Sequence, residues 1–341
     1  MGFAIRFLNR QPVAVSLLIL LVTAWGFRAT HEFVVNVLQP RQLAARRAQV
    51  EAQIFDADTN YRRKKLSAAL GTYRYVLTAH GALLSPREQG SLHHRIGMSW
   101  KDLSERTEEQ ENLTRAIGAF REALAFRALS SDPEGYGETQ GQLGLVQARL
   151  ALATGNAAMF SEAIAAFGEA IKVRAPETDP MGFAALQIQI GNAHRERFES
   201  GEKQEDSRMN PALAAYDTAE GIARQLEDME TYARVNLERA QAHLKLAEGI
   251  FKRTNTRAAM ADLDRAIEVF TRNNFPREYG RAQRVLGDVY MKMYKEVPVN
   301  TGTAWRDSQQ RTQWQQSALR AYEMAAQFGA LNTPRLSSAG K

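Results

Sequence analysis

Apolar residues recur along the chain with the spacing of amphipathic helices. In residues 160–173, FSEAIAAFGEAIKV, the large apolar side chains Ile164, Phe167 and Ile171 follow one another at intervals of three and four. Such intervals place side chains on one face of an α-helix. The alternation of apolar and polar residues that is typical of β-strands is not evident anywhere in the sequence. We therefore expect an all-α protein.

This helical pattern is repeated. The nonapeptide AIAAFGEAI, which begins at Ala163, has related copies at intervals of 47, 47, 49, 47 and 59 residues. The copies begin at Ala69, Ala116, Ala163, Ala212, Ala259 and, more loosely, Ala318. Between them, a second motif aligns on Gly97, Gly144, Gly191, Glu238 and Gly287, at intervals of 47, 47, 47 and 49. Two motifs that keep one period indicate a solenoid of stacked units.

Each unit is predicted to be a pair of helices. Glycine inside a helix costs about 1 kcal/mol relative to alanine, so its return in four of the five second motifs indicates that another helix packs closely there. Pro133, Pro180 and Pro211 stand near the expected helix starts, where the missing N–H is harmless. We expect about six helix pairs over residues 66–330.

These residues resemble the tetratricopeptide repeat family. Leu143 and Gly144 match the large aliphatic residue and glycine of that family's first helix, and Ala163, Phe167 and Ala170 match its second helix. The period here is 47 residues, whereas the family repeats about every 34, so both helices are expected to be longer. The resemblance implies a helical-hairpin solenoid that binds other proteins.

The N-terminal segment is expected to reach a membrane. Residues 12–27, PVAVSLLILLVTAWGF, carry no charge, and apolar character continues with interruptions to residue 38. We predict a short tail at 1–10, a transmembrane signal anchor at 11–39 and a basic juxtamembrane segment at 40–65. A cleaved signal peptide and a buried core helix are the alternatives. The flanking arginines favour a bacterial inner-membrane protein with a periplasmic solenoid; a cytoplasm-facing solenoid stays open.

The net charge of +6 is confined to this N-terminal region. Residues 1–65 hold ten Lys and Arg against four Asp and Glu, and the remaining 276 residues hold 34 of each sign. A nucleic-acid-binding domain concentrates cations on its folded part, so no nucleic-acid partner is expected. The chain has no cysteine, which excludes disulfides, thiolate metal sites and a cysteine nucleophile.

Side-chain patterns for catalysis are lacking. His31 begins HEFVV, without the second histidine of a metalloprotease helix. His93 and His94 adjoin on one helix and cannot chelate one ion together. Ser200 and Lys203 have the Ser-x-x-Lys spacing but lie in a polar connection. We expect no enzyme activity, cofactor, metal or small-molecule substrate, and a flexible tail at 331–341.

The resemblance also implies where a partner binds. In the family, first helices line a concave groove, and the side chain two before the glycine points inward. Polar side chains at such positions can hydrogen-bond an extended peptide, and the arginines can pair with carboxylates. The groove candidates are Arg95, Gln142, Gln189, Asn192, Arg195, Asn236 and Arg239. Trp305 and Trp314, in the long last connection, either cap the solenoid or contact a partner.

The sequence therefore favours a membrane-anchored adaptor or scaffold. Two alternatives remain, both without a catalytic step of their own. One is a permanent accessory subunit of a membrane complex, and the other is an accessory to an enzyme of envelope or polysaccharide assembly.

Overall fold

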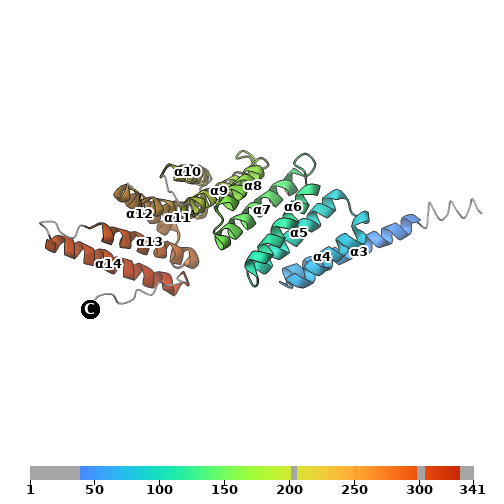
Figure 1. Cartoon of the computed structure of the whole chain (residues 1–341), viewed down its shortest axis with the longest axis horizontal. Coiled ribbons are helices and arrows are strands. Elements are labelled where there is room, and N and C mark those ends of the chain that lie inside the picture. Colours follow the sequence, from blue (N-terminus) through green and yellow to red (C-terminus); the bar gives the residue numbers. More distant parts are fainter. Residues whose placement is uncertain (1–38, 201–205, 250, 298–303, 331–341) are drawn as a thin grey trace, which may run out of the picture. The chain divides into compact units, whose positions relative to one another are not determined.

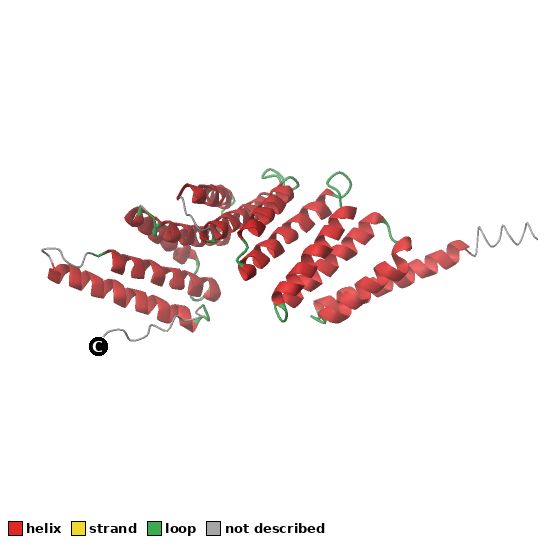
Figure 2. Ribbon diagram, viewed as in Figure 1, coloured by secondary structure: helices red, strands yellow, loops and turns green. Residues whose placement is uncertain are grey.

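The structure is a computed structural model that describes residues 39–200, 206–249, 251–297 and 304–330. Within those ranges the chain forms twelve α-helices, two short 3₁₀ turns and no strand (Figure 1 and Figure 2). It divides into two compact units, residues 1–85 and 86–341, each considered by itself. The all-α prediction is confirmed for the described part of the chain.

The first unit contains one helical hairpin. It consists of α3 (Gln39–Arg62), α4 (Leu66–His80) and the 3₁₀ turn η2 (Gly81–Leu83). Val50 of α3 and Tyr73 of α4 are buried, and the Tyr73 hydroxyl donates a hydrogen bond to Asp58 Oδ1 at 2.6 Å. Most of the basic segment 40–65 is thus the first helix of a hairpin, although residues 41–49 are exposed.

The second unit contains five hairpins in chain order. In each, the first and second helices pack against each other, and each second helix packs against the next first helix. The hairpins are α5 (Pro86–Ser104) with α6 (Glu109–Phe126), α7 (Pro133–Thr154) with α8 (Ala157–Ile171), α9 (Pro180–Glu199) with α10 (Asn210–Gln225), α11 (Met229–Leu246) with α12 (Lys252–Val269), and α13 (Pro276–Glu296) with α14 (Ala304–Gln327); the 3₁₀ turn η3 (Asp206–Met209) precedes α10.

Consecutive first helices also contact one another: α5 with α7, α7 with α9, α9 with α11, and α11 with α13. The first helices therefore form one layer of the second unit. The connections agree with the sequence, because α7 and α9 begin at their prolines and Pro211 is the second residue of α10.

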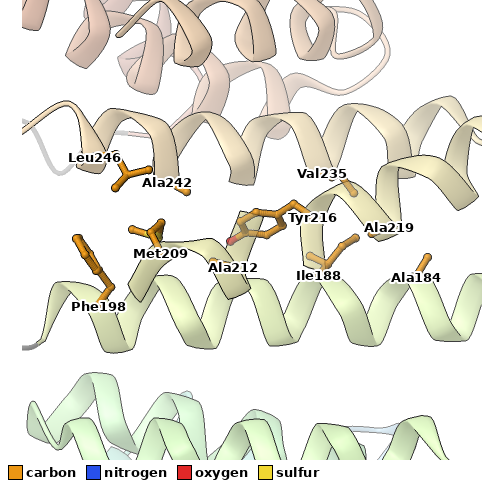
Figure 3. Packing of buried hydrophobic residues seen from close by; sticks show 10 residues of the cluster. All are labelled: Ala184, Ile188, Phe198, Met209, Ala212, Tyr216, Ala219, Val235, Ala242 and Leu246. Atoms are coloured by element: carbon orange, nitrogen blue, oxygen red, sulfur yellow. The ribbon is translucent and has the colours of Figure 1, made fainter. Parts of the chain in front are cut away.

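The recurring glycines are where an aromatic ring meets the first helix. A Cβ atom built on Gly191 would lie 2.5 Å from the Tyr216 ring, and the same closeness recurs at Gly97, Gly144 and Gly287. Figure 3 shows Tyr216 lying between Ile188 of α9 and Val235 of α11, within a cluster of buried apolar side chains. Close packing at the glycines, which the sequence predicted, is confirmed.

The predicted membrane anchor, residues 11–39, lies outside the described residues except for Gln39, with which α3 begins. Of the helices that the structure describes, from α3 onward, none combines the length and the apolar character that crossing a bilayer requires.

Candidate partner-binding face

Three of the predicted groove residues occupy equivalent places on adjacent first helices. Arg95 of α5, Gln142 of α7 and Gln189 of α9 each stand two residues before the recurring glycine, and each is half-buried. Their helices contact one another in sequence. The fold therefore brings together three polar side chains that are 47 residues apart in the chain.

Polar bonds join the first helices along this layer. Lys101 Nζ of α5 donates to Gln142 Oε1 of α7 at 2.9 Å. Further along, Glu238 of α11 accepts from Arg195 of α9 at 3.4 Å and from Arg281 of α13 at 2.7 Å. Glu238 is 6% exposed, so it is a buried anion compensated from both neighbouring helices. These bonds join α5 to α7, α9 to α11 and α11 to α13.

Two more of the predicted groove residues lie inside the fold. Asn236 is 0% exposed and its side chain donates to Tyr232 O at 2.9 Å. Arg239 is 7% exposed and holds Asp262 of α12 with two bonds, Nε to Oδ2 at 3.1 Å and Nη2 to Oδ1 at 2.8 Å. Its Nη1 also donates to Glu220 of α10 at 2.6 Å. Arg239 thus joins three helices and is already paired.

Arg195 and Asn192 are likewise engaged with the chain itself. Arg195 is 8% exposed, and besides Glu238 it pairs with Glu196 at 3.0 Å. Burial alone would lower the pKa of Arg195, but the nearby charges, Glu196 and Glu238 among them, raise it above its ordinary value. Asn192 Oδ1 accepts a hydrogen bond from the Tyr216 hydroxyl at 2.8 Å.

The histidines of α5 pack inside the protein. His93 stacks on Phe126 with ring centroids 5.6 Å apart. His94 is 6% exposed, and its Nδ1 lies 3.0 Å from Thr139 Oγ1. The hydrogen bond with His94 lowers the pKa of Glu138 to about 2, against the opposing effect of partial burial. The stacking of His93 joins α5 to α6, and the contacts of His94 with Thr139 and Glu138 join α5 to α7.

The sequence analysis placed Trp305 and Trp314 in the last connection, but both belong to α14, which begins at Ala304. Trp314 of α14 is half-buried and stacks on Tyr290 of α13, with centroids 5.7 Å apart and planes at 18°. Trp305 stands at the start of α14, and its side chain lies outside the described part.

The sequence analysis missed a third periodic motif, Arg-x₄-Asp-Pro-x-Gly, in the connections between hairpins. It occurs at Arg127–Gly135 and again, 47 residues later, at Arg174–Gly182. Asp179 Oδ1 accepts from Gly182 N at 2.9 Å, and Arg174 donates to Asp179 at 2.8 Å. Asp179 thus caps α9, whereas Asp132 stands at the N-cap of α7 without such a side-chain bond. The 47-residue spacing itself was the available signal.

Within the described residues, no group of three His, Asp or Glu side chains is placed so that it could hold a metal ion. What the first helices offer is hydrogen-bonding surface at regular intervals.

Comparison with known proteins identifies the fold and no more. No family model matches the chain. No curated protein sequence matches it either. The apo form of RapI is a structural match with TM-score 0.51 at 13% identity, over 82% of this chain and 97% of RapI.

Two other solved structures match over similar lengths. BtubC (BKLC) from P. vanneervenii has TM-score 0.48 at 14% identity, over 86% of this chain and 97% of that one. A computationally designed, self-assembling cyclic homo-oligomer has TM-score 0.23 at 14% identity, over 87% and 99%. The chain has a helical-repeat fold; these likenesses carry no function with them.

Proposed function

We propose that this chain is a tetratricopeptide-like adaptor that binds a segment of a partner protein across the first helices α5, α7 and α9. The observation that carries the proposal is the row formed by Arg95, Gln142 and Gln189, which are half-buried and occupy one register on three helices in contact. On the next two first helices, α11 and α13, the residues at the equivalent position are buried: Asn236 is 0% and Val285 1% exposed. The binding row is therefore limited to the first three hairpins of the second unit.

The spacing of this row suits an extended peptide. Packed helices lie roughly 8–10 Å apart, and an extended chain rises about 3.3 Å per residue. One polar side chain of the row would thus meet about every third residue of the peptide. The amide of Gln189 can both donate to and accept from a peptide backbone, the amide nitrogen of Gln142 can donate while its oxygen accepts from Lys101, and Arg95 can pair with a carboxylate.

The proposal includes a membrane anchor at residues 12–38, with the solenoid on the periplasmic side of a bacterial inner membrane. It rests on the uncharged stretch 12–27 and on the arginines that precede it. A tag placed after Lys341 should be cleaved by protease added to spheroplasts. A protected tag would place the solenoid in the cytoplasm.

The binding row is tested by capture of partners from gently solubilised membranes. The test variant is Arg95→Glu with Gln189→Glu, and the control is Arg277→Glu with Arg320→Glu, which changes two exposed arginines elsewhere in the second unit. We expect the test variant to lose the partner by tenfold or more at unchanged helical content, and the control to retain it.

The alternatives give different results. A permanent accessory subunit would keep its partners in the test variant and lose them when residues 12–27 are replaced by an unrelated apolar helix. Retention after both changes would contradict the adaptor and the subunit alike.

A further inference from the structure

The last helix is built differently from the other second helices. In α6 and α8 the recurring alanine, Ala116 or Ala163, comes seven or six residues after the helix start, whereas in α14 Ala318 comes fourteen residues after Ala304. Helix α14 therefore has about two additional turns at its N-terminal end. The other hairpins have no counterpart of these turns.

The turn of α14 that follows the added ones packs on the C-terminal half of α13. Trp314 stacks on Tyr290, and the guanidinium of Arg311 lies 4.6 Å from the centroid of the Tyr294 ring. Stacking and cation–π contacts of this kind hold this part of α14 against α13. A pocket of about 260 Å³ lies between α14, the end of α13 and the start of α12, and Gln310 at the end of the added turns also lines it.

The walls of this pocket differ in chemistry. On α12 stand Arg253 and Arg257, one helical turn apart and exposed, and within the described residues neither guanidinium has an ion-pair or hydrogen-bond partner. Opposite them are the apolar surfaces of Met293 and Trp314. Glu296 also lines the pocket, and its carboxylate accepts from Thr256 at 3.1 Å.

The surrounding charge has the same sign as the two arginines. Residues 251–327 contain thirteen Lys and Arg and eight Asp and Glu, whereas residues 66–250 contain nineteen and twenty-six. Although positive and negative charges are equal in number over residues 66–341, the first part of this range is acidic and the second part is basic. A basic field of this kind attracts an anionic partner and raises its association rate.

We propose that the pocket formed by Arg253, Arg257, Met293 and Trp314 docks an acidic segment of a partner protein, with carboxylates on the two guanidiniums and an adjacent apolar side chain against methionine and tryptophan. Paired arginines bind carboxylates with charge-assisted bonds. Methionine and tryptophan adapt to apolar side chains and are enriched where binding energy is concentrated. The inference rests on the proposed function as an interaction protein but uses a different surface.

Other occupants fit the pocket less well. The chain's own tail, residues 331–341, carries Arg335 and Lys341 and no acidic side chain, so the two arginines repel it. A single-stranded nucleic acid needs cations that follow its backbone. This pocket instead offers two arginines within one turn, with the carboxylate of Glu296 beside them.

The test is a selection of short random peptides on the immobilised full-length chain. The comparison target is the Arg253→Glu, Arg257→Glu variant, and the charge-matched control is Arg277→Glu with Arg320→Glu. We expect enriched peptides in which Asp or Glu flanks an apolar residue. A synthetic copy of the enriched peptide should bind the wild type and the control equally, and the pocket variant at least tenfold more weakly.

Any other result would contradict the proposed docking site. Enrichment of peptides without acidic residues, equal binding by the pocket variant, or no enrichment would contradict it. Competition by oligothymidine would indicate that the pocket binds single-stranded nucleic acid and not an acidic peptide. Light scattering tests for binding of a second copy. Concentration-dependent self-association that is abolished by Arg253→Glu with Arg257→Glu would mean that the pocket binds the acidic part of a second copy and not a partner protein. Some peptides could bind the pocket variant normally but fail to bind the Arg95→Glu, Gln189→Glu variant. That result would support the proposed function and contradict this second site.

Discussion

Gly144 of α7 and Phe167 of α8 approach so closely that a Cβ atom on Gly144 would lie 2.7 Å from the nearest ring carbon. The hairpin of α11 and α12 reverses this arrangement. There Glu238 takes the place of the glycine and Leu263 that of the ring. Both of these residues are buried. Compared with the other hairpins, this one has a larger side chain on the first helix and a smaller one on the second, so the sizes of the residues at the two positions compensate each other.

We expect Gly144→Ala to lower the free energy of unfolding by about 1–3 kcal/mol, because the new methyl group collides with Phe167 in a packed core. The loss should appear despite the helix propensity gained, about 1 kcal/mol. Urea unfolding measures it. Gly168→Ala is the control, since a Cβ atom there meets nothing within 4 Å, and it should raise stability. Adding Phe167→Leu to Gly144→Ala should cost less than the two single changes summed; strict additivity would contradict the coupling.

The tyrosine hydroxyls form a second coupled pair. Tyr216 donates to Asn192 at 2.8 Å and Tyr322 to Asp288 at 2.7 Å, so each bonds the residue after a recurring glycine. Where the ring is phenylalanine, the residue after the glycine is Met98 or Leu145. Tyr216→Phe should therefore cost about 1 kcal/mol in urea unfolding, since Asn192 loses its donor. The double change Tyr216→Phe with Asn192→Leu should recover most of that loss, and no recovery would show that the bond is not the cause.

The ion pair of Arg239 with Asp262 should be important for stability. Asp262→Ala leaves the guanidinium of Arg239 buried with part of its charge unpaired, and breaking a buried pair costs about 3–5 kcal/mol. Glu220 retains its bond to Arg239, so we expect the lower end of that range. Arg234→Ala removes an exposed i,i+4 pair with Glu230 and should change stability by less than about 0.5 kcal/mol. Equal effects of the two changes in thermal or urea unfolding would contradict the role of burial.

Stability should fall below neutral pH because of His194. Burial, with the nearby charge of Arg197, lowers the pKa of His194 from 6.5 to about 4. Between these values the unfolded chain binds a proton that the folded chain does not, so the free energy of unfolding decreases as pH falls. We expect a loss of about 1 kcal/mol from pH 7 to pH 5 attributable to this residue. His194→Gln should flatten the urea-unfolding profile in that window, and an unchanged slope would assign the effect to other groups.

Periodicity predicted most of the architecture. Helix pairs, proline starts and close packing at the glycines follow from short segments whose residues act on their immediate neighbours. The division of the chain at Ser85 and Pro86, and the helix α3 within the basic segment, were not evident because α3 lacks the repeat motifs and has only scattered buried residues.

The residues predicted to line the groove fall into an accessible group and a buried group, and an alignment of the repeats does not predict which residue belongs to which. Gln142 and Gln189 stay partly accessible, whereas Asn236 and Arg239 are enclosed, although all four stand on first helices near the recurring position. Burial depends on which side chains the neighbouring helices supply. Asp262 and Glu220 are 23 and 19 residues from Arg239 in the chain, and both meet its guanidinium.

By itself, the sequence determined the repeat, because a two-helix unit buries its apolar face only against copies that return the same packing residues at each step. Only the tertiary structure decided which polar side chains are bound within the protein and which reach its surface. Charged groups from different helices neutralise one another according to distance, and those distances are set by packing. The pocket beside Trp314 arises in the same way, where α13 and α14 of the last hairpin meet two arginines from the hairpin before it.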